Sequence, residues 1–249
     1  MKKRGPRVLI YALAILGLII LALAFMPLKL AVGMAGLENS RFSARDITGT
    51  IWRGQIEQAR MGSFALGDLN AGVRFFPLLA GRITLDLKRA AADGDSGLTA
   101  TIGKRGNDLL VENITTVLSV GQALAPLPVT DITLDNVNTR FSGGRCQSAS
   151  GKVRLSLDAN IPGLDLKQGL LGNAICDDGV LVLPLTSGSG MEELTLKLEG
   201  NGFYNARLFL NGNERAWTLL LPTLGFQQLP GGYAITVAGT LSGPLEQKR

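Results

Sequence analysis

The sequence has two cysteines, Cys146 and Cys176, whose thiols could form a disulfide, stay free or act in catalysis. In an oxidising compartment they would form a disulfide that closes a loop of about 30 residues, which stabilises a fold by on the order of 3–4 kcal/mol. Two buried free thiols are an alternative. A catalytic thiol is the least favoured interpretation, because the sequence has no histidine that could lower a cysteine pKa.

Other groups that could support catalysis or metal binding are sparse. Adjacent carboxylates occur at Asp177-Asp178 and at Glu192-Glu193. Neighbouring residues of a strand point to opposite faces, so neither pair can converge as an acid/base dyad, and both are interpreted as solvated turns. The basic string Gly103-Lys104-Arg105-Gly106 lacks the spacing of a phosphate-binding loop and is interpreted as a hairpin tip. We therefore predict no catalytic residue, no metal site and no cofactor, and we expect that the protein is not an enzyme.

The string Thr48-Gly49-Thr50-Ile51-Trp52-Arg53-Gly54 is the most distinctive in the sequence. Its two glycines predict a tight β-arch, with the indole of Trp52 covering exposed backbone. Tryptophan and arginine are enriched at binding hot spots, so Trp52 and Arg53 are candidates for a contact surface. The pattern favours the alternative, in which Trp52 is a core residue.

An apolar run from Val8 to Met26 precedes these motifs. A bilayer core of about 30 Å needs roughly 20 apolar residues as a helix. Lys2, Lys3, Arg4 and Arg7 lie before the run, which predicts a cytoplasmic N-terminus. We thus expect a cytoplasmic tail at 1–7, a single transmembrane helix at 8–28 and a β-rich domain at 29–249 on the far side. A cleaved signal peptide is the alternative, since Ala22-Leu23-Ala24 resembles a cleavage site.

The charge of the remaining chain argues against nucleic acid as a partner. The net charge of +5 includes those four basic residues, and without them 21 basic residues oppose 20 acidic ones. A nucleic-acid interface requires clustered lysine and arginine with interleaved aromatic residues, which the sequence lacks.

Alternation of apolar and polar residues with period 2 dominates after residue 41 and predicts antiparallel strands with one buried face. Glycine and asparagine turns separate these strands. The predicted strands are 82–88, 98–102, 131–135, 152–158, 193–199, 207–210 and 233–237. Two stretches lack the alternation, and we expect short helices at Thr116–Ala125 and at Ala216–Leu221, the latter ended by Gly225. The fold class is therefore mainly β.

Several strings together resemble the type II secretion system protein N family. They are the basic N-terminus with its single anchor, Gly49–Gly54, Leu66-Gly67, Phe76–Arg82, Cys146 with Cys176–Gly179, and Gly239-Thr240-Leu241. The sequence has Arg74-Phe75-Phe76 where the family usually has a tryptophan. The resemblance covers essentially the whole chain. It implies an elongated, curved antiparallel sheet, because the family also resembles the AsmA-like proteins.

The resemblance implies a function in the bacterial cell inner membrane. The first hypothesis is an accessory or structural component of the type II secretion system, with other subunits of that system as partners. The alternative is an AsmA-like β-groove that handles lipid or tethers membranes, and it predicts an open, continuous apolar groove. An enzyme is the third and least favoured hypothesis.

Overall fold

The computed structural model describes residues 11, 13–15, 17–18, 21, 24–34, 42–61, 64–91, 97–120, 124–158, 168–212, 215–240 and 243–244. Within them, seventeen strands form one sheet, and every pairing between them is antiparallel. The prediction of a mainly β protein with a large antiparallel sheet is confirmed.

The first half of the sheet is a meander in which strands that follow each other in the chain are hydrogen-bonded neighbours from β3 to β9. Both β1 and β2 pair with β3. The strands are β1 (Phe42–Ser43), β2 (Asp46–Thr50), β3 (Arg53–Met61), β4 (Phe64–Val73), β5 (Ile83–Arg89), β6 (Leu98–Arg105), β7 (Asp108–Ser119), β8 (Val129–Ser142) and β9 (Arg145–Leu157).

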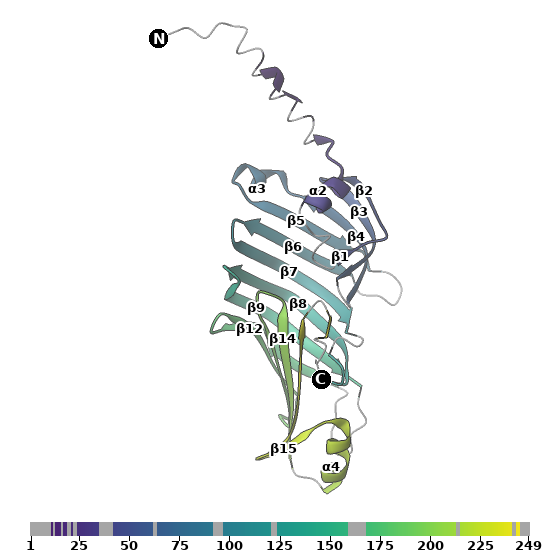
Figure 1. Cartoon of the computed structure of the whole chain (residues 1–249), viewed down its shortest axis with the longest axis vertical. Helices are drawn as coiled ribbons and strands as arrows, with labels where there is room; N and C mark the ends of the chain where they lie inside the picture. Colours follow the sequence, from purple (N-terminus) through teal and green to yellow (C-terminus); the bar gives the residue numbers. More distant parts are fainter. Residues whose placement is uncertain are drawn as a thin grey trace.

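The second half continues from β9 through β10, β12, β13 and β14 to β16, while β11, β15 and β17 are short strands along it. Its strands are β10 (Leu170–Asn173), β11 (Ile175–Asp177), β12 (Val180–Thr186), β13 (Glu192–Leu198), β14 (Phe203–Asn211), β15 (Gln227–Leu229), β16 (Gly232–Thr240) and β17 (Gly243–Pro244). The molecule is elongated, and β12 and β14 run in a direction different from that of β5 to β8 (Figure 1). All seven strands expected from the alternation of residues are present.

Short helices lie at the two ends of the sheet. The helices α2 (Leu28–Met34) and α3 (Phe75–Leu79) lie at the same end as β2, and α4 (Arg215–Leu220) lies at the opposite end (Figure 1). The 3-10 helix η2 (Leu221–Leu224) follows α4 and ends at Gly225, whose left-handed φ of 89° suits glycine. The short helix expected at Ala216–Leu221, with its stop at Gly225, is confirmed.

The predicted transmembrane helix at 8–28 lies only partly within the described residues, and its last residues are not part of a continuous helix: Pro27 forms a β-bridge with Thr50, and α2 begins at Leu28. In the described part of the chain, no helix has the length and apolar character needed to cross a bilayer.

The larger hydrophobic core extends from β8 and β9 through the second half of the sheet. The alternation of buried residues along β14 follows the period of 2 in its sequence. Leu185, Leu194, Leu208 and Ile235 lie directly opposite one another on β12, β13, β14 and β16, and all four are buried. Trp217 of α4 is fully buried beside this core, with its ring 6.5 Å from that of Tyr233.

The smaller core lies under α2 in the first half of the sheet. Leu28 contributes its side chain from α2, and Ile56, Leu69 and Leu98 contribute theirs from β3, β4 and β6. The helix therefore covers one face of the first strands and shields their apolar side chains from water.

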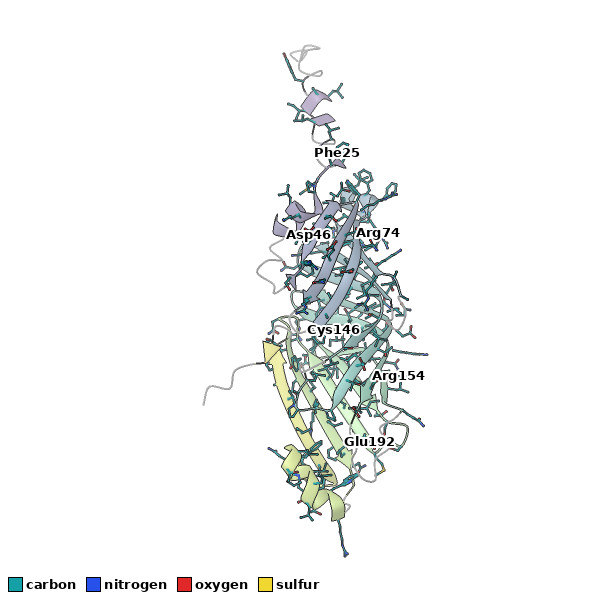
Figure 2. The ribbon with its side chains drawn as sticks, turned by 90° about the vertical axis from the view of Figure 1, so that its right-hand side faces the viewer. Phe25, Asp46, Arg74, Cys146, Arg154 and Glu192 are labelled. Carbon is teal, nitrogen blue, oxygen red and sulfur yellow. A yellow bond between two sulfur atoms is a disulfide. The ribbon has the colours of Figure 1, made fainter. Side chains whose placement is uncertain are left out.

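Cys146 and Cys176 form a disulfide with a Cα–Cα distance of 5.6 Å, which lies within the usual range for such bonds. The bond joins β9 to β11 in the middle of the molecule, where Cys146 is labelled (Figure 2). The backbone N–H of Cys146 also donates a hydrogen bond to the Gly179 carbonyl at 2.7 Å. The predicted pairing is present, and the alternative of two free thiols does not apply.

Two sequence-based expectations are wrong. Thr116–Ser119 belongs to β7 and pairs with β8. Strand pairing therefore overrides the expected helix there, and residues 121–123 lie outside the described part.

Glu192 was expected in a solvated turn but is almost fully buried in β13, where its carboxylate accepts a 2.8 Å hydrogen bond from Ser189 Oγ. The hydrogen-bonding hydroxyl offsets part of the cost of burying this carboxylate.

We expect the Cys146→Ala/Cys176→Ala double variant to lose on the order of 3–4 kcal/mol of unfolding free energy, because the disulfide no longer restricts the unfolded chain. The two cysteines are 30 residues apart. Urea unfolding of the full-length protein in detergent, without reductant, measures this change. A reductant should destabilise the wild type by a similar amount and leave the variant unaffected. Equal midpoints for the two oxidised proteins would contradict the prediction.

Candidate functional site

The distinctive string around Trp52 forms a tight β-hairpin between β2 and β3. Gly49 pairs with Gly54 and Thr50 with Arg53, which leaves Ile51 and Trp52 as the two turn residues. Gly49 has a φ of +80°, a conformation that favours glycine. The expected β-arch is therefore a hairpin, because its two strands are hydrogen-bonded to each other. Trp52 is half-buried, and it is not among the buried residues of either hydrophobic core.

The hairpin holds the C-terminal end of the predicted transmembrane run. The Nε1–H of Trp52 donates a 3.1 Å hydrogen bond to the Ala24 carbonyl. The Ile51 N–H donates one of 3.0 Å to the Met26 carbonyl, and Pro27 forms a β-bridge with Thr50. Three consecutive hairpin residues thus fix the backbone of residues 24–27 against the end of the sheet.

Gly54 allows the next residue to dock. Leu28 is buried with its side chain directly over Gly54. A Cβ at position 54 would overlap Cδ2 of Leu28 and would lie 3.1 Å from the Thr48 carbonyl oxygen. A larger residue than glycine would therefore push Leu28 out of the smaller core.

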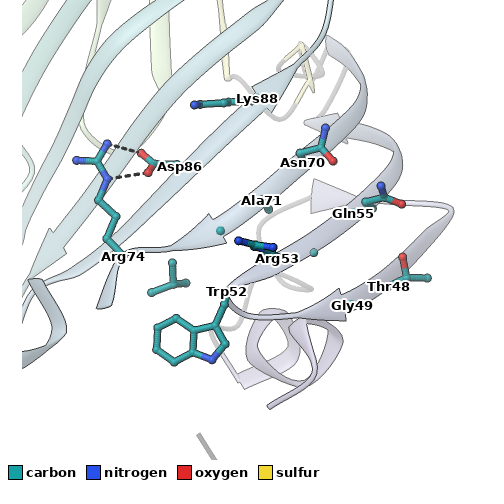
Figure 3. A pocket seen from close by; sticks show the side chains of 13 residues that line it. Thr48, Gly49, Trp52, Arg53, Gln55, Asn70, Ala71, Arg74, Asp86 and Lys88 are labelled. Atoms are coloured by element: carbon teal, nitrogen blue, oxygen red, sulfur yellow. Dashed lines mark hydrogen bonds and ion pairs between the residues drawn. The ribbon is translucent and has the colours of Figure 1, made fainter. Parts of the chain in front are cut away.

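A hollow of ≈ 580 Å³ lies beside the hairpin. Arg53, Arg74, Lys88 and Asp86 bring three positive charges and one negative charge to its wall (Figure 3). The remaining lining residues are small, polar or apolar: Thr48, Gly49, Trp52, Gly54, Gln55, Asn70, Ala71, Gly72 and Val73. A site of this composition can bind an acidic or hydrogen-bonding group of a partner.

Arg74 and Asp86 form a two-point ion pair in the wall of the hollow. Arg74 donates from Nε to Asp86 Oδ2 at 2.7 Å and from Nη2 to Oδ1 at 2.8 Å, and Thr101 Oγ1 donates to the same Oδ1 at 2.7 Å. The hydrogen bonds from Arg74 lower the pKa of Asp86 below its ordinary value, although partial burial opposes this, and Thr101 lowers the pKa further. The hydrogen bond to Asp86 likewise raises the pKa of Arg74.

The structure places the predicted site residues at separate locations. Trp52 and Arg53 lie at the hairpin, while the disulfide lies farther along the sheet. Sequence analysis did not identify Arg74 and Asp86 as functional residues. No group of three or more His, Cys, Asp or Glu side chains that could hold a metal ion is found among the described residues.

These features place the chain in a class of mainly β proteins, in which one end of a long antiparallel meander carries a hairpin with Trp52 in its turn. A family model described as "Type II secretion system (T2SS), protein N" matches residues 40–236, which include the hairpin, the hollow and both cysteines. The chain therefore belongs to the type II secretion system protein N family, and the resemblance found in the sequence is confirmed. Comparisons with curated proteins and with solved structures find no match.

We expect Gly54→Ala to weaken the docking of residues 24–28, because the added methyl group must displace Leu28; overpacking of this kind costs about 1–3 kcal/mol. Trypsin should then cut faster after Lys29, the second residue of α2, and mass spectrometry of the full-length protein in detergent measures the rate. Gly103→Ala is the matched control, since a Cβ there would lie at an ordinary 3.4 Å from Leu110 Cβ. Equal cleavage rates in the two variants would contradict the docking.

Asp86→Asn should lower stability at pH 7 by about 1 kcal/mol or less, since the ion pair is partly exposed to solvent. The folded pKa of Asp86 is lowered, so its stabilising effect is present above the ordinary carboxyl pKa of about 3.9 and disappears as the pH falls through the folded value. The difference between wild type and variant in urea unfolding should thus shrink between pH 7 and about pH 3. A difference independent of pH would contradict this assignment.

Proposed function

We propose that this chain is an inner-membrane accessory component of the type II secretion system, and that it assists export of folded periplasmic proteins across the outer membrane. It acts through protein–protein contacts and catalyses no reaction. The match of residues 40–236 to the protein N family carries this proposal.

The proposed anchor is a single transmembrane helix within residues 8–28 that ends before the β-bridge of Pro27, with residues 1–7 in the cytoplasm and the β-rich domain in the periplasm. The apolar run with its basic flank supports this topology. The described side chains of the run, such as Leu13, Leu18 and Leu21, are exposed, as lipid-facing side chains would be. The Cys146–Cys176 disulfide supports an oxidising compartment for the domain.

The hollow beside the hairpin is the proposed contact surface for another secretion subunit. Arg53 and Trp52 both line it, and they belong to the residue types that dominate binding energy at interfaces. The mixed charge of the wall suits an acidic or polar segment of the partner. The docked segment 24–28 would place this surface close to the membrane.

The far edge of the sheet offers a second mode of contact. On one side β16 pairs with β14 along its whole length. On the other side β15 pairs with residues 232–234 and β17 with residues 239–240, which leaves 235–238 without a strand partner there among the described residues. An extended segment of another subunit can add to such an edge through backbone hydrogen bonds.

Lipid handling is the second candidate, and one observation favours it. Leu85, Ile102 and Val111 lie opposite one another on β5, β6 and β7, so their side chains share one face of the sheet. All three are only half-buried. The hollow beside the hairpin, with its charged wall, lacks the continuous apolar lining that a lipid groove would have. Lipid recovered with the purified protein would favour this function.

We expect a photo-crosslinking residue at position 53 to capture another secretion subunit in cells that carry the whole system. Arg53→Ala should weaken that complex by about 2 kcal/mol, roughly thirtyfold in Kd, if Arg53 is a hot spot of the interface. Crosslinked partners are identified by mass spectrometry, and Kd is measured with the purified full-length protein.

Glu193 is the matched control for the crosslink, because it is an exposed charged residue on β13, away from the hollow. A crosslinker at Thr236 tests the free edge of β16 in the same experiment. Capture of secretion subunits at positions 53 and 193 to the same extent would exclude the hollow as the contact surface. Failure of the full-length protein to purify with any secretion subunit would contradict the proposed function itself.

A further inference from the structure

The helix α3 carries a cluster of large apolar side chains in contact with solvent. Phe76 is 81% exposed and Leu79 is 73% exposed, and Phe75 and Ile83 are also more than half exposed. None of the residues of α3 is buried. We call Phe75, Phe76, Leu79 and Ile83 the α3 patch. An exposed apolar cluster of this kind on a protein marks a surface that contacts a partner or a membrane.

A chain of direct contacts links the α3 patch to the end of the predicted transmembrane run. The ring of Phe75 lies 5.9 Å from the rings of both Trp52 and Phe76. Trp52 in turn donates its hydrogen bond to the Ala24 carbonyl. The patch is therefore separated from residue 24 by one side chain, and Phe25 is labelled at the same end of the molecule (Figure 2).

This position fixes the depth of the patch if residues 8–26 span the bilayer. A helix of that length extends about 28 Å, close to the thickness of the hydrocarbon core. Ala24 then lies where the hydrocarbon meets the lipid headgroups. Trp52 and Phe75 must lie near the same level because of their contacts. Aromatic side chains are enriched at this level of membrane proteins.

The charges around the patch suit a membrane surface. Residues 75–81 carry no charge, and Arg74 and Arg82 lie immediately on either side of them. No acidic residue occurs between 69 and 85. Arg74 is held by Asp86, whereas the exposed Arg82 can reach lipid phosphates while the apolar residues before it enter the interface.

We propose that the α3 patch inserts into the periplasmic leaflet of the membrane that holds the anchor, as a second point of membrane contact. This inference rests on the proposed anchor at 8–28. Phe76 and Leu79 enter the boundary between headgroups and acyl chains, and Trp52 bridges the patch to the anchor. With two points of contact, the sheet has a fixed orientation on the membrane instead of rotating about one helix.

The test uses the full-length protein in vesicles of phosphatidylcholine and phosphatidylglycerol that contain a nitroxide-labelled lipid. One cysteine is added by the substitution Phe76→Cys and is coupled to an environment-sensitive fluorophore. No reductant is used, so the native disulfide stays closed and only the added thiol reacts. We expect the nitroxide lipid to quench this fluorophore several-fold more than one at Leu219→Cys. Leu219 is the matched control because it is also 81% exposed but lies in α4 at the opposite end. A fluorophore at Leu18→Cys, within the apolar run, reports on the anchor.

The outcomes separate the anchor from the patch. Strong quenching at 18 and 76 with little at 219 supports the inference. Quenching at 18 with equally weak quenching at 76 and 219 overturns it, leaves the anchor in place and points to a protein subunit as the partner of the patch. Weak quenching at all three positions overturns the anchor and the inference together.

A second variant tests the patch without a fluorophore at position 76. With the fluorophore at Leu79→Cys, the added substitution Phe76→Asp should reduce quenching several-fold, because a charged residue resists burial in lipid. Phe76 is exposed, so its substitution should leave the thermal unfolding of the protein unchanged, and this is measured alongside. Unchanged quenching in the Phe76→Asp variant would overturn the inference.

Discussion

The close approach of Leu28 to Gly54 is the contact on which the arrangement at one end of the molecule depends. Glycine at position 54 lets the Leu28 side chain reach the smaller core, and the backbone of residues 24–27 then aligns with the hairpin turn. Gly54 and Trp52 both line the hollow (Figure 3), and the Trp52 ring contacts Phe75 of α3. Their positions relative to the end of the apolar run are therefore set by the packing of Leu28 on Gly54 together with the backbone contacts of the hairpin to residues 24–27.

The two halves of the sheet are stabilised in different ways. The second half has rows of leucines in register across four strands, a buried Trp217 and the disulfide near its start. In the first half, the smaller core on β3, β4 and β6 depends on the cover supplied by α2, which contributes Leu28. Contacts with α2 therefore stabilise the first strands of the sheet, and the neighbouring strands β5 and β6 carry the partly exposed residues Leu85 and Ile102.

The sequence predicts the strands well and the site poorly, for a physical reason. Period-2 alternation is a local property, so it locates β5, β9, β13 and β14 without knowledge of their neighbours. The ion pair of Arg74 with Asp86 depends on register instead, because Asp86 lies opposite Gly72 on β4 and opposite Thr101 on β6. Glu192 shows the same limit, since its burial depends on Ser189 and on the packing of β13 against its neighbours. The glycines of the hairpin predicted a tight turn, but the residue that docks on Gly54 is 26 positions earlier in the chain.

The placement of the contact surfaces along the molecule bears on how a member of this family could act. The hairpin between β2 and β3 and the helix α3 lie at one end, whereas β15 and α4 lie at the other (Figure 1). Since β3 to β9 and β12 to β16 are linked by continuous backbone hydrogen bonds, a load on one end is transmitted through the sheet to the other end. With an anchor at the first end, residues 235–238 of β16, which have no second strand partner among the described residues, would lie in the half of the molecule that is farther from the membrane. A partner that added a strand there would then be held at a distance set by the length of the sheet, which is the property expected of a structural component.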